Sequence, residues 1–229
     1  MKIITWNCNL NFAKKYQYLE DQDADILIIQ ECEKLKEDYF PDQKFFWTGR
    51  IENKGLGILL KDKSARLHSS FNQDLINFLP LETESLNIVG VWAYNHRAVK
   101  FGDNVSGNTF DAINHYKDWL SQDPKPSIFG GDFNNSIIWD KSNNENNFVN
   151  INKELEEIGF KSSYHSFREE EFGSEIQPTF FHTKNESKKY HIDYLYSKLL
   201  KVNSLEVGSY FDWIQKSDHC PVVTEFKIL

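Results

Sequence analysis

Apolar residues along the chain gather in short runs that are typical of β-strands. The clearest run is Ile26–Ile29, four consecutive large aliphatic residues, which favours a strand buried on both faces. Further strands are predicted at about 2–5, 55–60, 86–92, 127–129, 202–208 and 222–226, and weaker ones at 65–71 and 75–79. Residues 178–181 and 190–196 are expected to pair around a polar turn. Strands therefore account for much of the chain.

Between these runs, apolar residues recur every three or four positions, which predicts helices. One helix is expected over about 12–20, a second over 110–120 with Asn108 or Thr109 as its cap, and a third over 148–158. Strands and helices alternate early and late, with antiparallel-looking stretches between. The pattern predicts two sheets packed face to face, with helices outside, in one domain covering residues 1–229.

Composition narrows the class of protein. Of 229 residues, 40% are hydrophobic and 15% aromatic, so the chain is globular and not disordered. No apolar run approaches the roughly 20 residues that cross a bilayer, and the first residues lead directly into strand-like sequence without a signal peptide. We therefore expect a cytoplasmic monomer without a membrane partner. The net charge of −8 argues against a protein that coats nucleic acid, but not against an enzyme that binds a few phosphates.

The three cysteines do not indicate a metal site or a disulfide framework. Cys8, Cys32 and Cys220 match no zinc-binding spacing, and their number is odd. Each follows a polar residue at a strand-like segment, so we expect three small buried packing residues.

Polar residues cluster where predicted strands end. The strand that finishes at Phe129 is followed by two glycines, Asp132 and Asn134. By itself this stretch indicates an Asx-type turn, because Asp and Asn are common in turns. However, similar residues lie at or beside other predicted strands: Asn7, Glu31, Asp193, Asp218 and His219. If these strand ends converge, the polar side chains line one pocket.

Such a pocket has the groups needed to hydrolyse a phosphate ester. Magnesium takes oxygen ligands and uses one or two protein carboxylates, which Glu31 and Asp218 would supply. Asp193 would hydrogen-bond the imidazole of His219 and fix its tautomer. The metal would neutralise phosphate charge while a further carboxylate positions the attacking water.

Five short motifs occur in an order that resembles the endonuclease/exonuclease/phosphatase superfamily. They are Thr5-Trp6-Asn7, Gln30-Glu31, Gly131-Asp132-Phe133-Asn134, His191-Ile192-Asp193-Tyr194 and Ser217-Asp218-His219-Cys220-Pro221. The superfamily includes abasic-site endonucleases, pancreatic-type deoxyribonuclease, inositol-polyphosphate 5-phosphatases and bacterial sphingomyelinases. The motifs run from residue 5 to residue 221, so the resemblance covers nearly the whole chain. It implies a four-layer α/β sandwich with two packed mixed β-sheets flanked by helices.

The resemblance also implies a role for each matched residue. Glu31 would bind Mg²⁺, or Mn²⁺ in its place, with Asp218 and Asn7 close by, directly or through water.

On the catalytic side, the resemblance implies that Asp132 orients or deprotonates a water, helped by Asn134. His219, supported by Asp193, would steady a phosphate oxygen or act in proton transfer.

Two departures concern the substrate. Abasic-site enzymes usually carry an Asp two residues after the first-strand Asn, and this chain has Asn9 there. At a middle-strand position where many DNA enzymes have Tyr and many phosphatases His, this chain has Trp92, with Asn95 at a phosphate-contacting site. Tyr94 or His96 would substitute if the register shifts by a few residues. Neither subfamily pattern is matched cleanly.

The expected function is a Mg²⁺-dependent phosphodiester hydrolase, in the first place a nuclease that acts on DNA or RNA. The alternatives are a phosphatase or phosphodiesterase on a small molecule or lipid headgroup, and a non-catalytic binding member of the family. A nuclease is expected to gather lysines around its cleft, with these as candidates: Lys14, Lys15, Lys54, Lys100, Lys188 and Lys189. For most of them, however, a solvated surface is the simpler interpretation.

Overall fold

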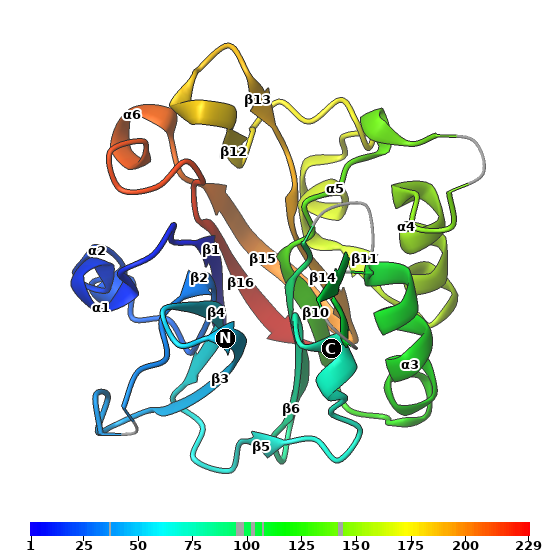
Figure 1. Cartoon of the computed structure of the whole chain (residues 1–229). Coiled ribbons are helices and arrows are strands. Elements are labelled where there is room, and N and C mark those ends of the chain that lie inside the picture. Colours follow the sequence, from blue (N-terminus) through cyan, green and yellow to red (C-terminus); the bar gives the residue numbers. More distant parts are fainter. Residues whose placement is uncertain (37, 95–98, 102–103, 107, 142–143) are drawn as a thin grey trace.

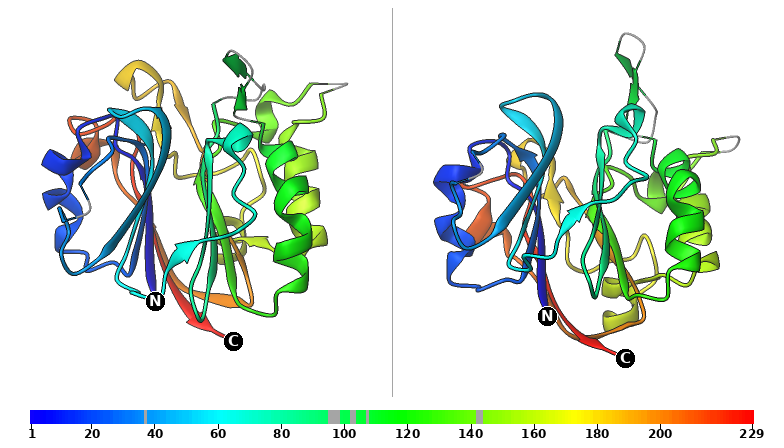
Figure 2. Two further views of the ribbon diagram at one scale, coloured as in Figure 1. Left: turned by 60° about the horizontal axis from the view of Figure 1, so that its bottom comes forward. Right: turned by 90° about the horizontal axis from the view of Figure 1, so that it is seen from below.

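The structure is a computed structural model that describes residues 1–36, 38–94, 99–101, 104–106, 108–141 and 144–229. Within these residues, two six-stranded mixed sheets pack face to face and helices cover their outer faces (Figures 1 and 2). This arrangement confirms the predicted α/β sandwich. No helix in the described part of the chain is long and apolar enough to cross a bilayer.

The first sheet has the strand order β15-β16-β1-β2-β4-β3. Its strands are β1 (Lys2–Asn7), β2 (Ile26–Cys32), β3 (Lys44–Ile51), β4 (Lys54–Leu60), β15 (Leu200–Val207) and β16 (Val222–Ile228). β1 runs parallel to β2 and antiparallel to β16. The carboxyl ends of β1 and β2 therefore lie beside the segment that leads into β16.

The second sheet has the order β11-β14-β10-β7-β6-β5. Its strands are β5 (Arg66–Leu67), β6 (Phe78–Glu82), β7 (Asn87–Trp92), β10 (Ser127–Asp132), β11 (Lys161–Ser162) and β14 (Asp193–Lys198). β10 runs parallel to β7 and antiparallel to β14, so Asp132 is in register with both Trp92 and Asp193. Two short strand pairs stand outside the sheets: β8 (Val99–Phe101) with β9 (Asn104–Ser106), and β12 (Phe180–Phe181) with β13 (Lys189–Tyr190).

Alternate residues of the central strands point into different cores. In β2, Ile26 and Ile28 lie between the two sheets, whereas Leu27 and Ile29 lie under the helices that cover the first sheet. Both faces of the strand are buried, which explains its uninterrupted apolar sequence.

The helices form the two outer layers (Figure 2). The first sheet is covered by α1 (Phe12–Lys15), α2 (Gln17–Glu20) and α6 (Tyr210–Trp213), and the second by α3 (Thr109–Gln122) and α4 (Phe148–Glu157). A further helix, α5 (Ser163–Arg168), contacts β14 and β15. Short 3₁₀ turns occupy Gln73–Leu75, Ile137–Trp139 and His182–Lys184.

Several predicted elements differ in detail. The helix expected over 12–20 is two short helices that meet at Tyr16. The weak strand expected at 75–79 is present as β6 but displaced, because a 3₁₀ turn ends at Leu75 and β6 begins only at Phe78. Residues 190–196 do not form one strand, since β13 ends at Tyr190 and β14 belongs to the second sheet. The three cysteines are buried free thiols, as predicted.

Candidate active site

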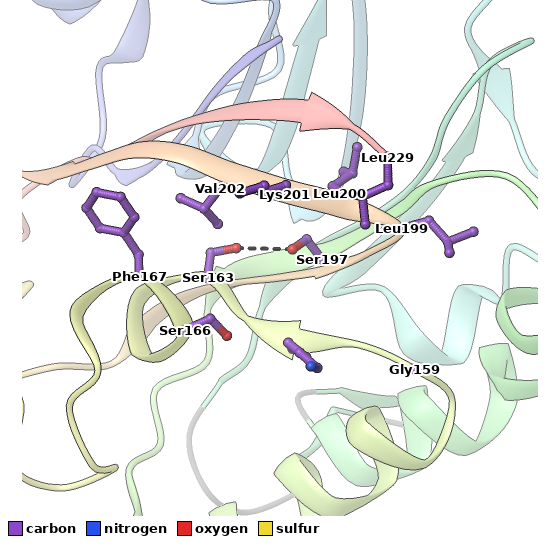
Figure 3. Close-up of a pocket in the computed structure, with 11 residues that line it drawn as sticks. Gly159, Ser163, Ser166, Phe167, Ser197, Leu199, Leu200, Lys201, Val202 and Leu229 are labelled. Atoms are coloured by element: carbon purple, nitrogen blue, oxygen red, sulfur yellow. Dashed lines mark hydrogen bonds between the residues drawn. The ribbon is translucent and has the colours of Figure 1, made fainter.

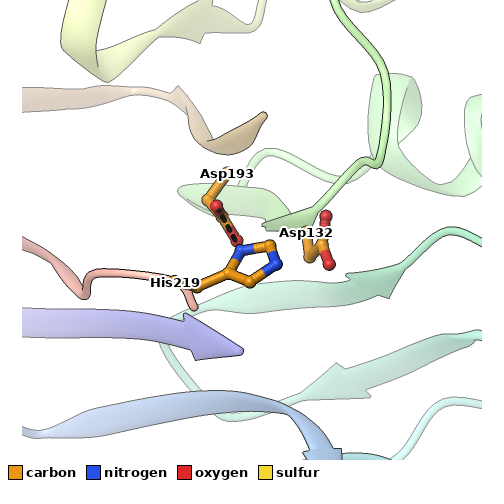
Figure 4. Close-up of side chains that lie close together, drawn as sticks. All are labelled: Asp132, Asp193 and His219. Atoms are coloured by element: carbon orange, nitrogen blue, oxygen red, sulfur yellow. Dashed lines mark hydrogen bonds and ion pairs between the residues drawn. The ribbon is translucent and has the colours of Figure 1, made fainter. Parts of the chain in front are cut away.

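Three of the predicted site residues meet where the two sheets face each other. One ligand atom from each of Asp132, Asp193 and His219 lies within 4.8 Å of the others, and all three side chains are buried. In Figure 4 the imidazole of His219 lies between the two carboxylates. They come from the end of β10, the start of β14 and the segment before β16.

A tight turn after β10 fixes the position of Asp132. The backbone N–H of Asn134 donates to Asp132 Oδ1 over 2.8 Å, so the predicted Asx turn is present. Asn134 has a φ of 46° and Gly131 a φ of 147°. At Gly131 a Cβ atom would lie 1.9 Å from the carbonyl oxygen of Val91, so only glycine fits there.

Amide side chains from two directions hold the Asp132 carboxylate. Its Oδ2 accepts hydrogen bonds from Asn7 Nδ2 at 2.9 Å and from Asn134 Nδ2 at 3.0 Å. Asn7 belongs to the first sheet, whereas Asn134 follows the second and also donates to the carbonyl of Ala93. The carboxylate is therefore fixed by both halves of the molecule.

Burial strongly affects the charge of Asp132. Complete burial, and then the neighbouring Asp193 carboxylate, raise the pKa of Asp132 to about 7. The nearby His219 and the hydrogen bond from Asn7 act in the opposite direction. The group thus titrates close to neutral pH.

His219 forms a hydrogen-bonded pair with Asp193. His219 Nδ1 lies 2.9 Å from Asp193 Oδ2, which leaves Nε2 on the Asp132 side of the ring (Figure 4). Burial alone would lower the pKa of His219, but the carboxylates of Asp193 and Asp132 outweigh it and raise the pKa to about 9. The backbone N–H of Asp193 donates to Thr179 Oγ1. The pair therefore favours an imidazolium held in one orientation.

Neighbouring groups hold His219 in place, and sequence reasoning gave them no role. Ser217 Oγ accepts from the backbone N–H of His219 and donates to the carbonyl oxygen of Asn7 at the end of β1. Trp6 Nε1 donates to the His219 carbonyl, and the Phe180 ring lies 4.5 Å from the imidazole. Trp6 and Ser217 are motif residues, whereas no signal in the sequence identified Phe180.

A β-bulge displaces Glu31 from its strand. The pairing of β2 with β4 shifts between Gln30 and Cys32, and Glu31 between them has a φ of 56°. The backbone N–H of Leu10, in the loop after β1, donates to the Glu31 carbonyl. The Glu31 side chain is 21% exposed, so it is open to a ligand.

The same loop holds Asp218. Asn9 Nδ2 donates to Asp218 Oδ1 over 3.0 Å, and the Asn9 backbone N–H donates to Asn7 Oδ1. Asn9, which departs from the family motif, is therefore a hydrogen-bonding neighbour of two predicted metal-site residues.

The donor groups of this region fit a hard divalent cation. Glu31, Asp218 and Asn7 offer carboxylate and amide oxygens at neighbouring strand ends. Glu31 already has a cation beside it, because Lys54 Nζ lies 3.0 Å from its Oε2. The Glu31 carboxylate therefore lies where it accepts a positively charged partner.

Trp92 and Lys54 approach each other across the two sheets. Lys54 Nζ lies 5.5 Å from the centre of the half-buried Trp92 ring, which ends β7 beside Asp132. The other predicted substrate contact, Asn95, lies outside the described residues, as does His96.

Of the remaining candidate lysines, Lys15 also lies near the site. Its ammonium donates to the carbonyls of Cys8 and Asn9 in the loop after β1. Lys188 and Lys189 are exposed near β13, and the side chain of Lys100 is not described.

A cavity of about 420 Å³ lies at the other end of β14 from Asp193 (Figure 3). Serine, lysine and aliphatic side chains dominate its lining, with Ser163 and Ser197 in contact through their hydroxyl groups. No aspartate, glutamate or histidine side chain of the described residues lines it. Its chemistry does not match that of the candidate active site.

Comparisons with known proteins identify the fold. No protein-family model matches the sequence, and no curated protein sequence matches it either. Among solved structures, the 3′-5′ exonuclease NExo from Neisseria meningitidis is similar at 20% identity, with a TM-score of 0.69 over 99% of this chain and 100% of that one.

Two further structures match over the whole length of both chains. They are an AP endonuclease from Archaeoglobus fulgidus, at 14% identity and a TM-score of 0.70, and an endonuclease/exonuclease/phosphatase family protein from Leptotrichia buccalis, at 17% and 0.65. The chain therefore has the fold of the endonuclease/exonuclease/phosphatase superfamily that its five motifs resemble.

Proposed function

We propose that the chain is a metal-dependent phosphoesterase, and in the first place a nuclease that cleaves DNA or RNA. The observation that carries the proposal is a buried Asp–His pair beside a second buried aspartate, with ligand atoms within 4.8 Å of one another. These residues are Asp193, His219 and Asp132, and the hydrogen bond from Asn7 to Asp132 joins them to the first sheet.

In the proposed mechanism, Asp132 positions and deprotonates the attacking water. Its carboxylate is fixed by hydrogen bonds from Asn7 and Asn134, so it meets the water in a set orientation. When bound at Glu31, Asp218 and Asn7, Mg²⁺ or Mn²⁺ supplies charge neutralisation for the phosphate and the leaving oxygen.

His219 binds a non-bridging oxygen of the phosphate in this proposal. Asp193 holds the ring through Nδ1, so Nε2 is the atom that faces the substrate. A protonated imidazole there stabilises the negative charge that develops in the transition state. Asp193 is a positioning residue, since it acts through the ring.

Similar structures support nucleic acid as the substrate. One is described as an AP endonuclease, one as a 3′-5′ exonuclease, and one as a 3′ phosphatase of Neisseria bound to a product DNA hairpin, the last at 19% identity and a TM-score of 0.70 over 99% of both chains. The net charge of −8 favours a second candidate, a small phosphate ester, because such a substrate needs no extended basic surface.

A substrate panel tests the proposal. Plasmid DNA, single-stranded DNA, RNA, inositol phosphates and a generic bis-phosphodiester are each incubated with Mg²⁺ and with a chelator. We expect hydrolysis of a nucleic acid that stops when the chelator is added. Activity that survives the chelator would contradict the metal site, and activity on inositol phosphates alone would favour the second candidate.

On the substrate found, Asp132→Ala and His219→Ala are each expected to lower kcat by roughly 10²–10⁴-fold, the usual range when an acid–base group or a hydrogen-bond donor to the transition state is removed. Asp74→Ala and His115→Ala, at exposed positions, are the matched controls and should retain activity. Circular dichroism checks that the variants fold. Near-wild-type turnover in either site variant would refute the assignment.

A further inference from the structure

The ion pair between Lys54 and Glu31 lies at the rim between the two sheets and has no role in the mechanism above. Lys54 Nζ is 3.0 Å from Glu31 Oε2, and the two side chains are 37% and 21% exposed. An isolated ion pair at such exposure contributes little to folding stability. Because Glu31 is a proposed metal ligand, the ion pair bears on metal binding instead.

Irregular backbone at Glu31 and at Lys54 directs the two side chains toward each other. Glu31 is the extra residue of a bulge in β2, and its left-handed conformation turns the side chain out of the regular ladder. Lys54 opens β4 directly after a hairpin, paired with Ile51, where the register of β3 against β4 also shifts. Strand pairing therefore fixes the backbone at both residues, and this determines where the two side chains meet.

The Lys54 ammonium has a second partner in the opposite sheet. It lies 5.5 Å from the centre of the Trp92 ring, within the range of a cation–π interaction. Trp92 is in register with Asp132, so this ring borders the strand end that carries the proposed water-activating carboxylate. Lys54 thus lies between Glu31 on one side and the Asp132 strand end on the other.

From this geometry we infer that Lys54 competes with the divalent cation for Glu31 and, once displaced, binds a phosphate oxygen of the substrate. An ammonium group and a dication that bind the same carboxylate repel each other, so each weakens the binding of the other. The flexible four-carbon stem of lysine allows the head group to move. The Trp92 ring keeps the displaced ammonium near the site, where a phosphate oxygen replaces the lost carboxylate partner.

This inference rests on the proposed function, and it predicts opposite effects on metal and substrate. Lys54→Met keeps the length of the stem but removes the charge. We expect it to bind Mn²⁺ roughly fivefold more tightly, because the loss of one ion pair of this exposure changes affinity by about that factor. The same variant should raise KM for the phosphate ester about tenfold, because a charge-assisted hydrogen bond is lost.

The chain offers a closely matched control. Lys61 lies just beyond the opposite end of β4, pairs with Asp23 at 2.7 Å, and has a side chain that is 36% exposed. Lys61→Met therefore removes the same charge next to the same strand at nearly the same exposure. Lys54→Arg retains a positive charge and should keep Mn²⁺ affinity nearer to the wild-type value than Lys54→Met does.

Mn²⁺ binding is measured by isothermal titration calorimetry on the whole chain without substrate, with Glu31→Gln as the reference variant. Tighter binding in Lys54→Met but not in Lys61→Met supports the inference. Unchanged or weaker binding in Lys54→Met, together with lost binding in Glu31→Gln, overturns the role of Lys54 but leaves the metal site intact. Wild-type binding in Glu31→Gln instead overturns the metal site on which the proposed function depends.

Discussion

At the scale of single residues, the candidate site depends on backbone conformations that most amino acids avoid. Glu31 and Asn134 both have positive φ angles, and each is a residue with a proposed chemical role. Asn tolerates the left-handed region because its short side chain bonds locally, whereas Glu gains nothing comparable. Strain of this kind persists where the surrounding structure fixes it, which here includes the strand pairing beside the bulge.

Gly131 has no room for a side chain, because the backbone of Val91 lies against it. We expect Gly131→Ala to lower the free energy of unfolding by about 3 kcal/mol or more, because the added Cβ meets the Val91 carbonyl oxygen at 1.9 Å and rigid backbone must move. Chemical denaturation measures the loss.

Gly159→Ala is the matched control for this prediction. Its φ is 90°, but the nearest atom to an added Cβ is 3.8 Å away on the flexible Lys198 side chain. It should cost only about 1–2 kcal/mol, the price of the left-handed conformation alone. Equal losses in the two variants would show that close packing against Val91 is not the cause.

At the scale of elements, the sequence predicted best what is continuous and buried. The strand at Ile26–Ile29 was correct because its apolar run is uninterrupted, and the helix capped by Asn108 was correct because its apolar period is long and its cap is local. β3 was missed because half-buried residues dominate it, and α5 and α6 are too short to show a period. Local sequence patterns therefore predict the buried central elements, but not the edge strand or the short helices.

For the candidate site too, local sequence motifs were predicted and contacts between distant strands were not. The residues of the five motifs were identified from the sequence, and Asp132, Asp193 and His219 come together as expected. The bulge at Glu31 and its pairing with Lys54 were not predicted, because both depend on the register between strands that are distant in the sequence. The contact of Phe180 with the imidazole of His219 was not predicted for the same reason.

The loop of residues 169–179, between α5 and β12, is rich in glutamate and is joined to the fold by a buried histidine, which makes its docking sensitive to pH. His191 Nδ1 is 2.7 Å from the carbonyl oxygen of Gln177, and the Tyr164 ring packs 4.4 Å from the imidazole. Burial lowers the pKa of His191 below its usual 6.5. The unfolded chain therefore binds a proton at this position more readily, so the contribution of His191 to stability is complete above pH 6.5 and falls as the pH drops below it.

We expect the change in melting temperature from pH 7.5 to pH 5.5 to be more favourable in His191→Asn than in the wild type, because the variant lacks the imidazole that burial keeps neutral while its amide can still donate to Gln177. Asp132 and His219 act in the opposite direction in both proteins, because their raised pKa values make folding more favourable at the lower pH. Thermal melting at the two pH values tests this. An equal change in both proteins would show that His191 does not contribute to the pH dependence.

At the scale of the whole molecule, each sheet carries half of the candidate site. Asn7 and Glu31 belong to the first sheet, whereas Asp132 and Asp193 belong to the second. The hydrogen bond from Asn7 to Asp132 crosses between them, so the spacing of the sheets sets the alignment of the site. Gly90 is where the sheets approach closely, because an added Cβ would lie 2.7 Å from Ile58 Cδ1.

Gly90→Ala should therefore destabilise the fold by about 1–3 kcal/mol, the usual cost of overpacking, and also lower kcat although it lies away from the chemistry. Ile58→Val removes the clashing methyl group. The double variant should lose less stability than the sum of the two single variants, as measured in a double-mutant cycle. Additive losses would indicate that the sheets do not meet at this point.

The position of β1 in the middle of the first sheet has a consequence for synthesis on the ribosome. β1 bonds β2 on one edge and β16 on the other, and Ser217 donates to the Asn7 carbonyl across 210 positions of sequence. While the nascent chain is still being translated, β1 is an unpaired edge strand that invites association with other chains. The candidate site can be assembled only after the segment that carries His219, just before β16, has left the exit tunnel, so a shorter nascent chain has both an incomplete site and an exposed strand edge.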